Sequence, residues 1–261
     1  MSSMLLKIIN ERASVREFDK RRRVSDDLTR RILVAGIRAP SAGNIQPRTF
    51  IVVEDERTRE QLYDLCENQT FMKDASLWIV VCADVHRHLR AAELTGVNYD
   101  YVGVLPLTFS VLDAALSLEN MVIAADSLGL GSVIIGSVIE HPLEAQRILK
   151  LPKHSLAISI LCIGHPKKNP RRREKWSHKI IVCKDAYKDV AKEDVEEYWK
   201  RFIMSDIKRS GRKLSMHELE ELIKGGKQMS YGAAYSNHYT VKLVKNTNRK
   251  LSAFLKKQGF L

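Results

Sequence analysis

The sequence predicts an α+β protein whose helices and sheet are layered much as in an α/β protein. Two observations favour this class. Strand-like apolar runs, such as 77–83 and 155–164, alternate along the chain with segments of helical periodicity. Toward the C-terminus the strand-like runs stop, and the remaining segments are helical and basic. We therefore expect a layered body over residues 1–184 and a mainly helical extension over 185–261, packed on the body or on a partner subunit.

The first part of the body should begin with two helices. One covers residues 4–10, and the other follows Ser25, a typical N-cap residue whose two following aspartates suit a first helical turn. This second helix must end before Pro40, because the residue before a proline disfavours helical geometry. A strand at 49–54, a helix at 56–67 and a strand at 77–83 come next. The run L-W-I-V-V-C-A at 77–83 has no polar alternation, which is typical of a strand buried on both faces.

The longest expected helix covers residues 107–128 and is rich in Leu, Ala, Val and Met. Its alanines would let another backbone approach closely, so it is either a core helix or a subunit interface. Three acidic residues within the apolar stretch 104–134 argue against a membrane span. The body is completed by strands at 132–136 and 155–164 and by a helix at 142–149.

The extension should contain three helices. The first covers the segment V-E-E-Y-W-K-R-F-I-M at 195–204. Ser215 and Glu218 form the S-x-x-E pattern of a capping box, and the helix that it starts should end at the glycine pair 225–226. A Tyr-rich stretch at 231–240 precedes a last helix over about 247–257.

The basic character lies almost wholly in the last third of the chain. The net charge is +12, yet residues 1–170 hold 21 Lys and Arg against 20 Asp and Glu, whereas residues 171–261 hold 22 against 11. A strongly basic segment can bind nucleic acid, an anionic membrane surface or an acidic partner. An exposed helical surface also explains it, because Lys and Arg are good helix formers, and we favour that interpretation.

The cysteines indicate free thiols. None of the four has the spacing of a metal ligand, and three lie in or beside apolar runs, as buried thiols do. We therefore expect no metal site and no disulfide framework, and a reducing cytoplasm as the location. The apolar run at the N-terminus is too short for a signal peptide. The four cysteines are Cys66, Cys82, Cys162 and Cys183.

Four clusters carry the functional signal. R-A-S-V-R at 12–16 places two guanidinium groups and a hydroxyl within five residues. A-P-S-A-G-N-I-Q-P at 39–47 adds Ser41, Asn44 and Gln46 in a loop that two prolines hold out of helix geometry. Such a set suits a ligand with a phosphate at one end and a flat polar ring at the other, which points to flavin mononucleotide (FMN). The other clusters are G-L-G-S-V-I-I-G-S at 129–137 and G-H-P-K-K-N-P-R-R-R-E-K at 164–175.

In their order, composition and approximate spacing, these clusters resemble the FMN-dependent nitroreductase family, from residue 4 to about residue 183. The resemblance implies a central, mostly antiparallel sheet flanked by helices, and a homodimer that binds FMN in a cleft between subunits. It also implies an oxidoreductase with a ping-pong mechanism. NAD(P)H would give a hydride to the flavin N5 and leave, and an electron-poor acceptor such as a nitroaromatic compound or a quinone would then enter the same pocket.

The resemblance assigns phosphate binding to four residues. Arg12 and Ser14 match the residues that hold the FMN phosphate, and bidentate guanidinium geometry suits phosphate oxygens. Arg173 and Lys175 match the family's second phosphate-binding pair. Arg16 matches a basic position nearer the flavin ring, where a positive charge would stabilise negative charge at N1 and O2.

The resemblance places three further segments beside the flavin. The loop along the cofactor is matched by Pro40, Ser41, Ala42 and Asn44, with Gln46 beside them. Asn68 matches an amide directed at the ring. The segment that passes the ring is matched by Ile134, Ile135, Gly136 and Ser137. No side-chain acid or base is evident, so the expected catalytic groups are Arg16 and a backbone N–H near Gly136 that would reach N5, both as electrostatic tuners.

Two features depart from the family pattern. Members often place a lysine facing the ring three residues after Asn68, whereas this chain has Phe71, which leaves the charge at the flavin edge to Arg16. The basic tail lies outside the resemblance, and it could form the lid of a flavin-fragmenting or dehalogenating relative. An alternative stays open: a flavoprotein-fold binding module whose tail docks an acidic electron-carrier protein or nucleic acid. Nucleic acid is disfavoured, because the aromatic residues around 231–239 lack interleaved Lys and Arg.

Overall fold

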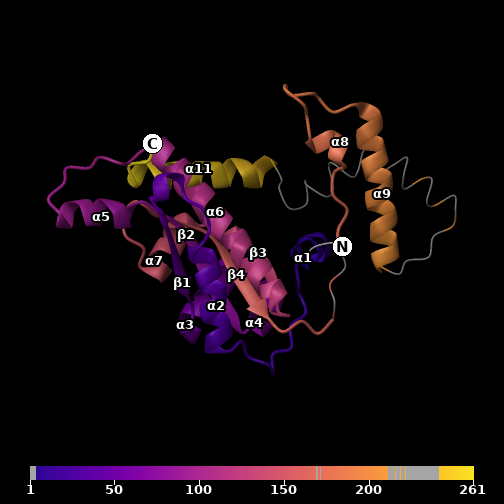
Figure 1. Cartoon of the computed structure of the whole chain (residues 1–261), viewed down its shortest axis with the longest axis horizontal. Helices are drawn as coiled ribbons and strands as arrows, with labels where there is room; N and C mark the ends of the chain where they lie inside the picture. The colour runs from indigo at the N-terminus through magenta and orange to yellow at the C-terminus, as the bar shows by residue number, and fades with distance from the viewer. Residues whose placement is uncertain are drawn as a thin grey trace. The chain divides into compact units, whose positions relative to one another are not determined.

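The computed structural model of the chain describes residues 4–168, 170, 172–210, 215, 218, 221 and 241–261. The chain divides into two compact units (Figure 1). One consists of Met1–Pro170 together with Thr247–Leu261, and the other of Arg171–Asn246. The sequence expectation put the boundary between residues 184 and 185 and assigned the whole C-terminus to the extension.

A four-stranded sheet forms the centre of the first unit, with every neighbouring pair antiparallel. Its strands stand in the order β1-β2-β4-β3, so that β1 and β3 are the two edges (Figure 1). The strands are β1 (Arg48–Val52), β2 (Leu77–Asp84), β3 (Gly131–Ile135) and β4 (Ser155–Gly164). The expected α+β class, with an antiparallel sheet flanked by helices, is confirmed.

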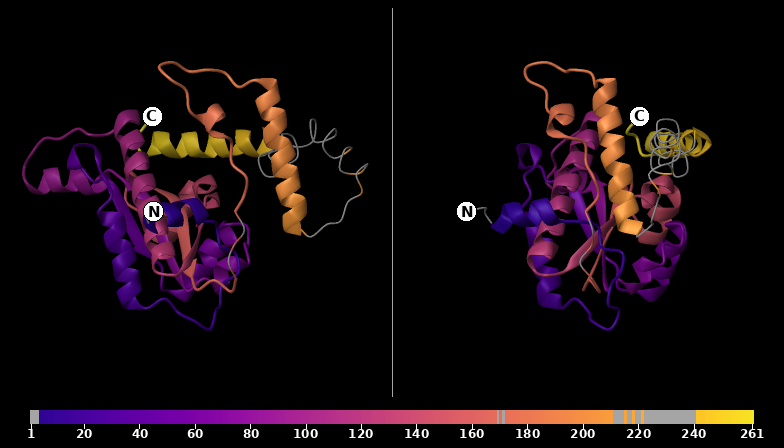
Figure 2. Two further views of the ribbon diagram at one scale, coloured as in Figure 1. Left: turned by 45° about the vertical axis from the view of Figure 1, so that its right-hand side comes forward. Right: turned by 90° about the vertical axis from the view of Figure 1, so that its right-hand side faces the viewer.

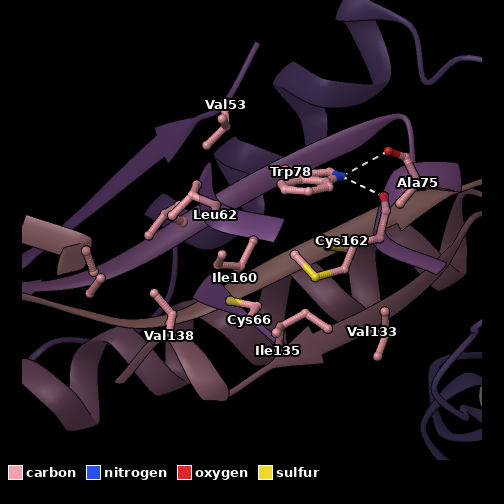
Figure 3. Close-up of a cluster of buried hydrophobic side chains, with 14 of the residues drawn as sticks. Val53, Leu62, Cys66, Ala75, Trp78, Val133, Ile135, Val138, Ile160 and Cys162 are labelled. Atoms are coloured by element: carbon pink, nitrogen blue, oxygen red, sulfur yellow. Dashed lines mark hydrogen bonds between the residues drawn. The ribbon is translucent and has the colours of Figure 1, made fainter. Parts of the chain in front are cut away.

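The two central strands explain why the sheet carries helices on both faces. All eight residues of β2 are buried, as its continuous apolar run predicts. Alternate side chains enter different cores: Ile79 joins a cluster beneath α2 (Asp26–Ile37) and α6 (Val104–Ser127). Trp78 joins the cluster on the opposite face (Figure 3). Its indole N–H lies 3.0 Å from the carbonyl oxygens of both Met72 and Ala75.

The second face is covered by shorter elements, which the two views of Figure 2 show from further sides. They are α3 (Glu56–Leu65), α4 (Phe71–Asp74), the 3₁₀ turn η2 (Ser137–Glu140) and α7 (Pro142–Leu149). The helices α5 (His86–Leu94) and α4 were not expected from the sequence. The first unit also contains α1 (Met4–Glu11) and the 3₁₀ turn η1 (Ala42–Asn44).

Helix α6 is long and apolar enough to cross a membrane by length and composition alone, a property that core helices of soluble proteins share. In this chain its Ala114, Met121 and Ala125 are fully buried in the core against the sheet. The helix therefore serves as a core element on one side. Its opposite side exposes Val104, Leu105, Leu112 and Leu116.

The C-terminal residues return to the first unit, which is why the observed division differs from the sequence expectation. Helix α11 (Val241–Lys257) ends in a segment whose Phe254, Gln258 and Phe260 are all at most 2% exposed. The Gln258 Oε1 atom accepts a 2.7 Å hydrogen bond from the backbone N–H of His154, and the Phe260 ring meets the His154 ring edge-on. Burial of these side chains fixes the end of the chain on the body.

The second unit has a small aromatic core of its own. It contains α8 (His178–Ile181) and α9 (Lys192–Ser210). Trp176 stacks on Tyr198 of α9 with ring centroids 4.1 Å apart, and Trp199 and Phe202 extend the cluster. Ser215 and Glu218 exchange the reciprocal hydrogen bonds of the expected capping box. The expected helix stop at 225–226 and the Tyr-rich stretch 231–240 lie outside the described residues.

The segment that follows α1 packs along the edge of the sheet at β3. The Val15 N–H donates to the Ser132 carbonyl oxygen at 2.9 Å, and Val15 and Phe18 are buried. Two glycines make this close packing possible, because they have no side chain. A Cβ on Gly131 would lie 2.4 Å from Val15 Cγ2, and a Cβ on Gly164 would lie 2.9 Å from Phe18 Cδ1. Because Val15 points inward, its neighbours Ser14 and Arg16 are exposed.

Gly131→Ala should therefore destabilise the protein, because the new methyl group overlaps a stiff β-branched side chain. We expect a loss of about 1–3 kcal/mol in the free energy of unfolding, measured by urea denaturation. Gly136→Ala is the matched control, since a Cβ there meets no atom within 4 Å and its φ is −87°. Equal stability of the two variants would contradict the close approach at Gly131.

Candidate functional site

The segment 12–16 presents its polar groups from the edge of the sheet. The half-buried Arg12 donates from Nε to Glu119 Oε1 of α6 over 3.4 Å. The Arg16 guanidinium carbon lies 5.7 Å from the centroid of the Phe71 ring, within the range of a cation–π contact. Phe71 stands at the position of the lysine noted above. It contacts Arg16, the residue that we expect to supply the positive charge at the flavin edge.

The surroundings of Arg12 are acidic. Burial raises the pKa of the Asp126 carboxyl to about 6; Arg12 acts in the opposite direction, and Glu119 adds to the rise. Glu119 and Asp126 are seven residues apart on α6, two helical turns, and so lie on one side of the helix. Arg12 is therefore held by α6 in a position where its positive charge is partly balanced.

The loop at 39–46 is closed by its own hydrogen bonds. Ser41 Oγ accepts from the Gln46 N–H at 2.7 Å, and Gln46 Nε2 lies 3.3 Å from both oxygens of Asn44. Gly43, Asn44 and Gln46 have φ values of 56°, 57° and 59°, a left-handed geometry that asparagine tolerates well. The Ser41 hydroxyl still has its own hydrogen to donate, and the exposed Asn44 keeps an amide N–H₂ as a donor.

A buried ion pair ties this loop to the body. Arg48 of β1 and Asp113 of α6 are 5% and 1% exposed, and Arg48 Nη1 lies 3.2 Å from Asp113 Oδ2. Arg48 Nη2 also donates to the carbonyl oxygens of Ile37, at the end of α2, and Ala39 at 3.0 and 3.1 Å. The second carboxylate oxygen of Asp113 accepts from the Ala42 N–H at 3.4 Å. Neither residue carries a signal of this pairing in the sequence, where Asp113 is one of the three acidic residues that argue against a membrane span.

The other two expected contact segments lie side by side. Gln69 Nε2 donates to the Cys66 carbonyl oxygen at 3.1 Å and to Ser137 Oγ at 3.3 Å, so the turn that carries Asn68 is joined to the segment after β3. Asn68 itself is exposed with a φ of 52°. Burial raises the pKa of the Cys66 thiol to about 11, so this thiol stays protonated at neutral pH.

Residues 134–137 differ in which groups they can offer to a ligand. Ile134 is exposed, and Gly136 is exposed with open space where a Cβ would stand. Ile135 is 2% exposed and belongs to the core cluster shown in Figure 3, so its side chain is not available to a ligand. Ser137 is 9% exposed, and its hydroxyl is engaged by Gln69.

The remaining candidates are divided between the two units. Pro40 is exposed and Ala42 half-buried, as members of the loop. Arg173 and Lys175 are exposed residues of the second unit. Their convergence with Arg12 and Ser14 stays a prediction.

Comparison with known proteins identifies the family of the chain. A sequence model described as the Nitroreductase family matches residues 9–165. The chain belongs to the nitroreductase family. The resemblance noted in the sequence is thereby confirmed.

Individual relatives of this nitroreductase-family chain extend the comparison. A putative NADH dehydrogenase/NAD(P)H nitroreductase of Archaeoglobus fulgidus is 37% identical over 189 residues, covering 66% of this chain and 98% of the relative. An FMN reductase (NADPH) of Bacillus subtilis is 28% identical over 190 residues, covering 72% and 75%. The solved structure of B. megaterium NfrA2 is 27% identical, has a TM-score of 0.84, and covers 99% of this chain and 98% of its own. The C-terminal extension therefore has a counterpart in that structure.

Removing one partner of the Arg48–Asp113 pair should destabilise the fold more than replacing both. Asp113→Ala leaves a buried guanidinium without its counterion, and the free energy of unfolding should fall by about 3–5 kcal/mol. The double variant R48M/D113L, with apolar side chains of similar volume, should lose much less. Urea denaturation of the three proteins measures both effects. A fully stable Asp113→Ala variant would contradict a buried ion pair.

Proposed function

We propose that the chain is an FMN-dependent NAD(P)H oxidoreductase that reduces an electron-poor acceptor, such as a nitroaromatic compound or a quinone. The observation that carries the proposal is the placement of donors along β3. The segment bearing Arg12, Ser14 and Arg16 is bonded at Ser132, and the open backbone at Gly136 lies four residues further on. Four residues of extended chain span roughly 13 Å, room for a phosphate, a ribityl chain and a flavin ring.

The residues present fit FMN. Arg12 and Ser14 supply a guanidinium and a hydroxyl for the phosphate, and Ser41 and Asn44 supply neutral donors on a preformed loop. Gly136 leaves space beside the ring, because no side chain occupies the position of its Cβ. When bound, FMN supplies the chemistry of hydride acceptance and donation.

The protein's own groups bind FMN and adjust the charge around its ring. Arg16, held against Phe71, places positive charge at the ring edge and favours the form of the cofactor that carries more negative charge. The backbone N–H near Gly136 offers a hydrogen bond at the reacting side of the ring. NAD(P)H and the acceptor use the same open face in turn, which is a ping-pong order. The names of the relatives, an NAD(P)H nitroreductase and an FMN reductase (NADPH), support this assignment.

The direct test is an anaerobic titration of the FMN-reconstituted protein with NADH and with NADPH. We expect a yellow protein whose visible flavin absorption is bleached by at least one of the two nucleotides and restored by a quinone. Arg12→Ala should weaken FMN binding by about 10- to 150-fold, the equivalent of a charge-assisted hydrogen bond. Arg22→Ala, an exposed arginine in the loop beyond the same segment, is the matched control. A protein that does not take up FMN would refute the proposal.

We also propose that the protein is a homodimer that uses the exposed side of α6. Apolar side chains gather there and on two neighbouring helices that pack against it: Met4, Leu5, Leu6 and Ile9 of α1, Val34 and Ile37 of α2, and Val104, Leu105, Val111, Leu112 and Leu116 of α6. An exposed apolar surface of this extent is typical of protein interfaces.

Leu112→Glu should convert the dimer to a monomer in sedimentation experiments, because it places a charge in the apolar surface at a position that is 52% exposed in the single chain. Gln61→Glu introduces the same charge on α3, on the other face of the sheet, and should leave the dimer intact. A parent protein that sediments as a monomer would contradict this part of the proposal.

A further inference from the structure

We propose that Arg48 and Asp113 are positioning residues for FMN. Their hydrogen bonds to the backbone of the loop 39–46 hold Ser41 and Asn44 in the geometry that binds the cofactor. The inference rests on the proposed function and deepens it. It assigns to a buried ion pair a role in cofactor affinity in addition to its role in stability.

The ion pair forms hydrogen bonds with the loop backbone on both sides of Pro40. Arg48 Nη2 donates to the carbonyl oxygen of Ala39, directly before the proline, at 3.1 Å. Asp113 Oδ1 accepts from the N–H of Ala42, two residues after it, at 3.4 Å. The two side chains are joined to each other at 3.2 Å, so β1, α6 and the loop form one connected unit.

One other described hydrogen bond of the loop reaches the body: the Ala39 N–H donates to the carbonyl oxygen of Gly36, near the end of α2, at 3.3 Å. The bonds of Ser41, Asn44 and Ile45 join loop residues to one another, and the Gln46 carbonyl oxygen accepts only from the N–H of Arg48, the next residue but one. These local bonds fix the internal shape of the loop, including its left-handed residues. Among the described hydrogen bonds of the loop, only that of the Ala42 N–H to Asp113 reaches α6, and Arg48 joins the same carboxylate to the Ala39 carbonyl oxygen.

The chemistry of the pair also favours a positional role. Two charges buried to this degree lose most of their hydration, and apolar residues of the same volume often stabilise a fold equally well. Hydrogen bonds from a guanidinium, however, have fixed directions, and Arg48 uses them on three acceptors at once. A donor displaced by about 1 Å loses much of its hydrogen bond, so a loosened loop should bind FMN less tightly.

The test compares FMN affinity with stability in matched variants. The double variant R48M/D113L keeps an apolar, packed interior but loses the hydrogen bonds from the ion pair to the loop. Asp113→Asn keeps the shape of the Asp113 side chain but loses its negative charge. Leu62→Ala is the control, because it creates a cavity in the core cluster on the other face of the sheet, which contains no residue of the loop. For each protein, the dissociation constant of FMN, the midpoint of thermal unfolding, and KM and kcat at saturating FMN are measured.

We expect the dissociation constant of FMN to be at least tenfold higher for R48M/D113L and for Asp113→Asn than for the parent. We expect kcat at saturating FMN to stay within twofold of the parent. Leu62→Ala should bind FMN within twofold of the parent although its unfolding midpoint falls. The inference is overturned if both loop variants bind FMN like the parent, or if Leu62→Ala loses as much affinity as they do. If the parent protein itself takes up no FMN, the proposed function fails, and that result is distinct from an equal affinity of parent and variants.

Discussion

The buried ion pair between Arg48 and Asp113 is the interaction on which the site depends most. It joins the edge strand β1 to the long helix α6, and Arg48 also donates to the carbonyl oxygens of Ile37, the last residue of α2, and of Ala39. Each partner would be strongly unfavourable alone in this interior, so the two residues require each other. One polar contact thus joins the sheet to the helix layer next to the loop 39–46.

The opposite edge of the sheet is fixed by close packing instead of charge. Because Gly131 and Gly164 have no side chain, Val15 and Phe18 can pack into the core. With Val15 buried, its neighbours Ser14 and Arg16 point outward. The site therefore draws on two unlike constraints, a directional hydrogen-bonded pair at one edge and steric fit at the other. Both act on short segments between regular elements, which is where binding residues of a rigid scaffold usually lie.

Much of the fold could be predicted because its signals are local. The Ser25 cap, whose hydroxyl accepts from the Leu28 N–H, and the apolar run of β2 are read from neighbouring residues alone. The pairing of Arg48 with Asp113 could not be read, since it joins positions 65 residues apart and an isolated charge gives no periodic signal. Ile135 was placed beside the flavin by its position in a motif, but strand alternation turns its side chain into the core.

A double-mutant cycle on FMN affinity tests the central claim most directly. If Asp113 acts through the loop, Ser41→Ala should weaken FMN binding by about fivefold in the parent, the value of one hydrogen bond, and by much less in the Asp113→Asn background. Ser14→Ala, on the other edge of the sheet, should have the same effect in both backgrounds. Equal effects of Ser41→Ala in the two backgrounds would contradict the account, because loop and ion pair would then act independently.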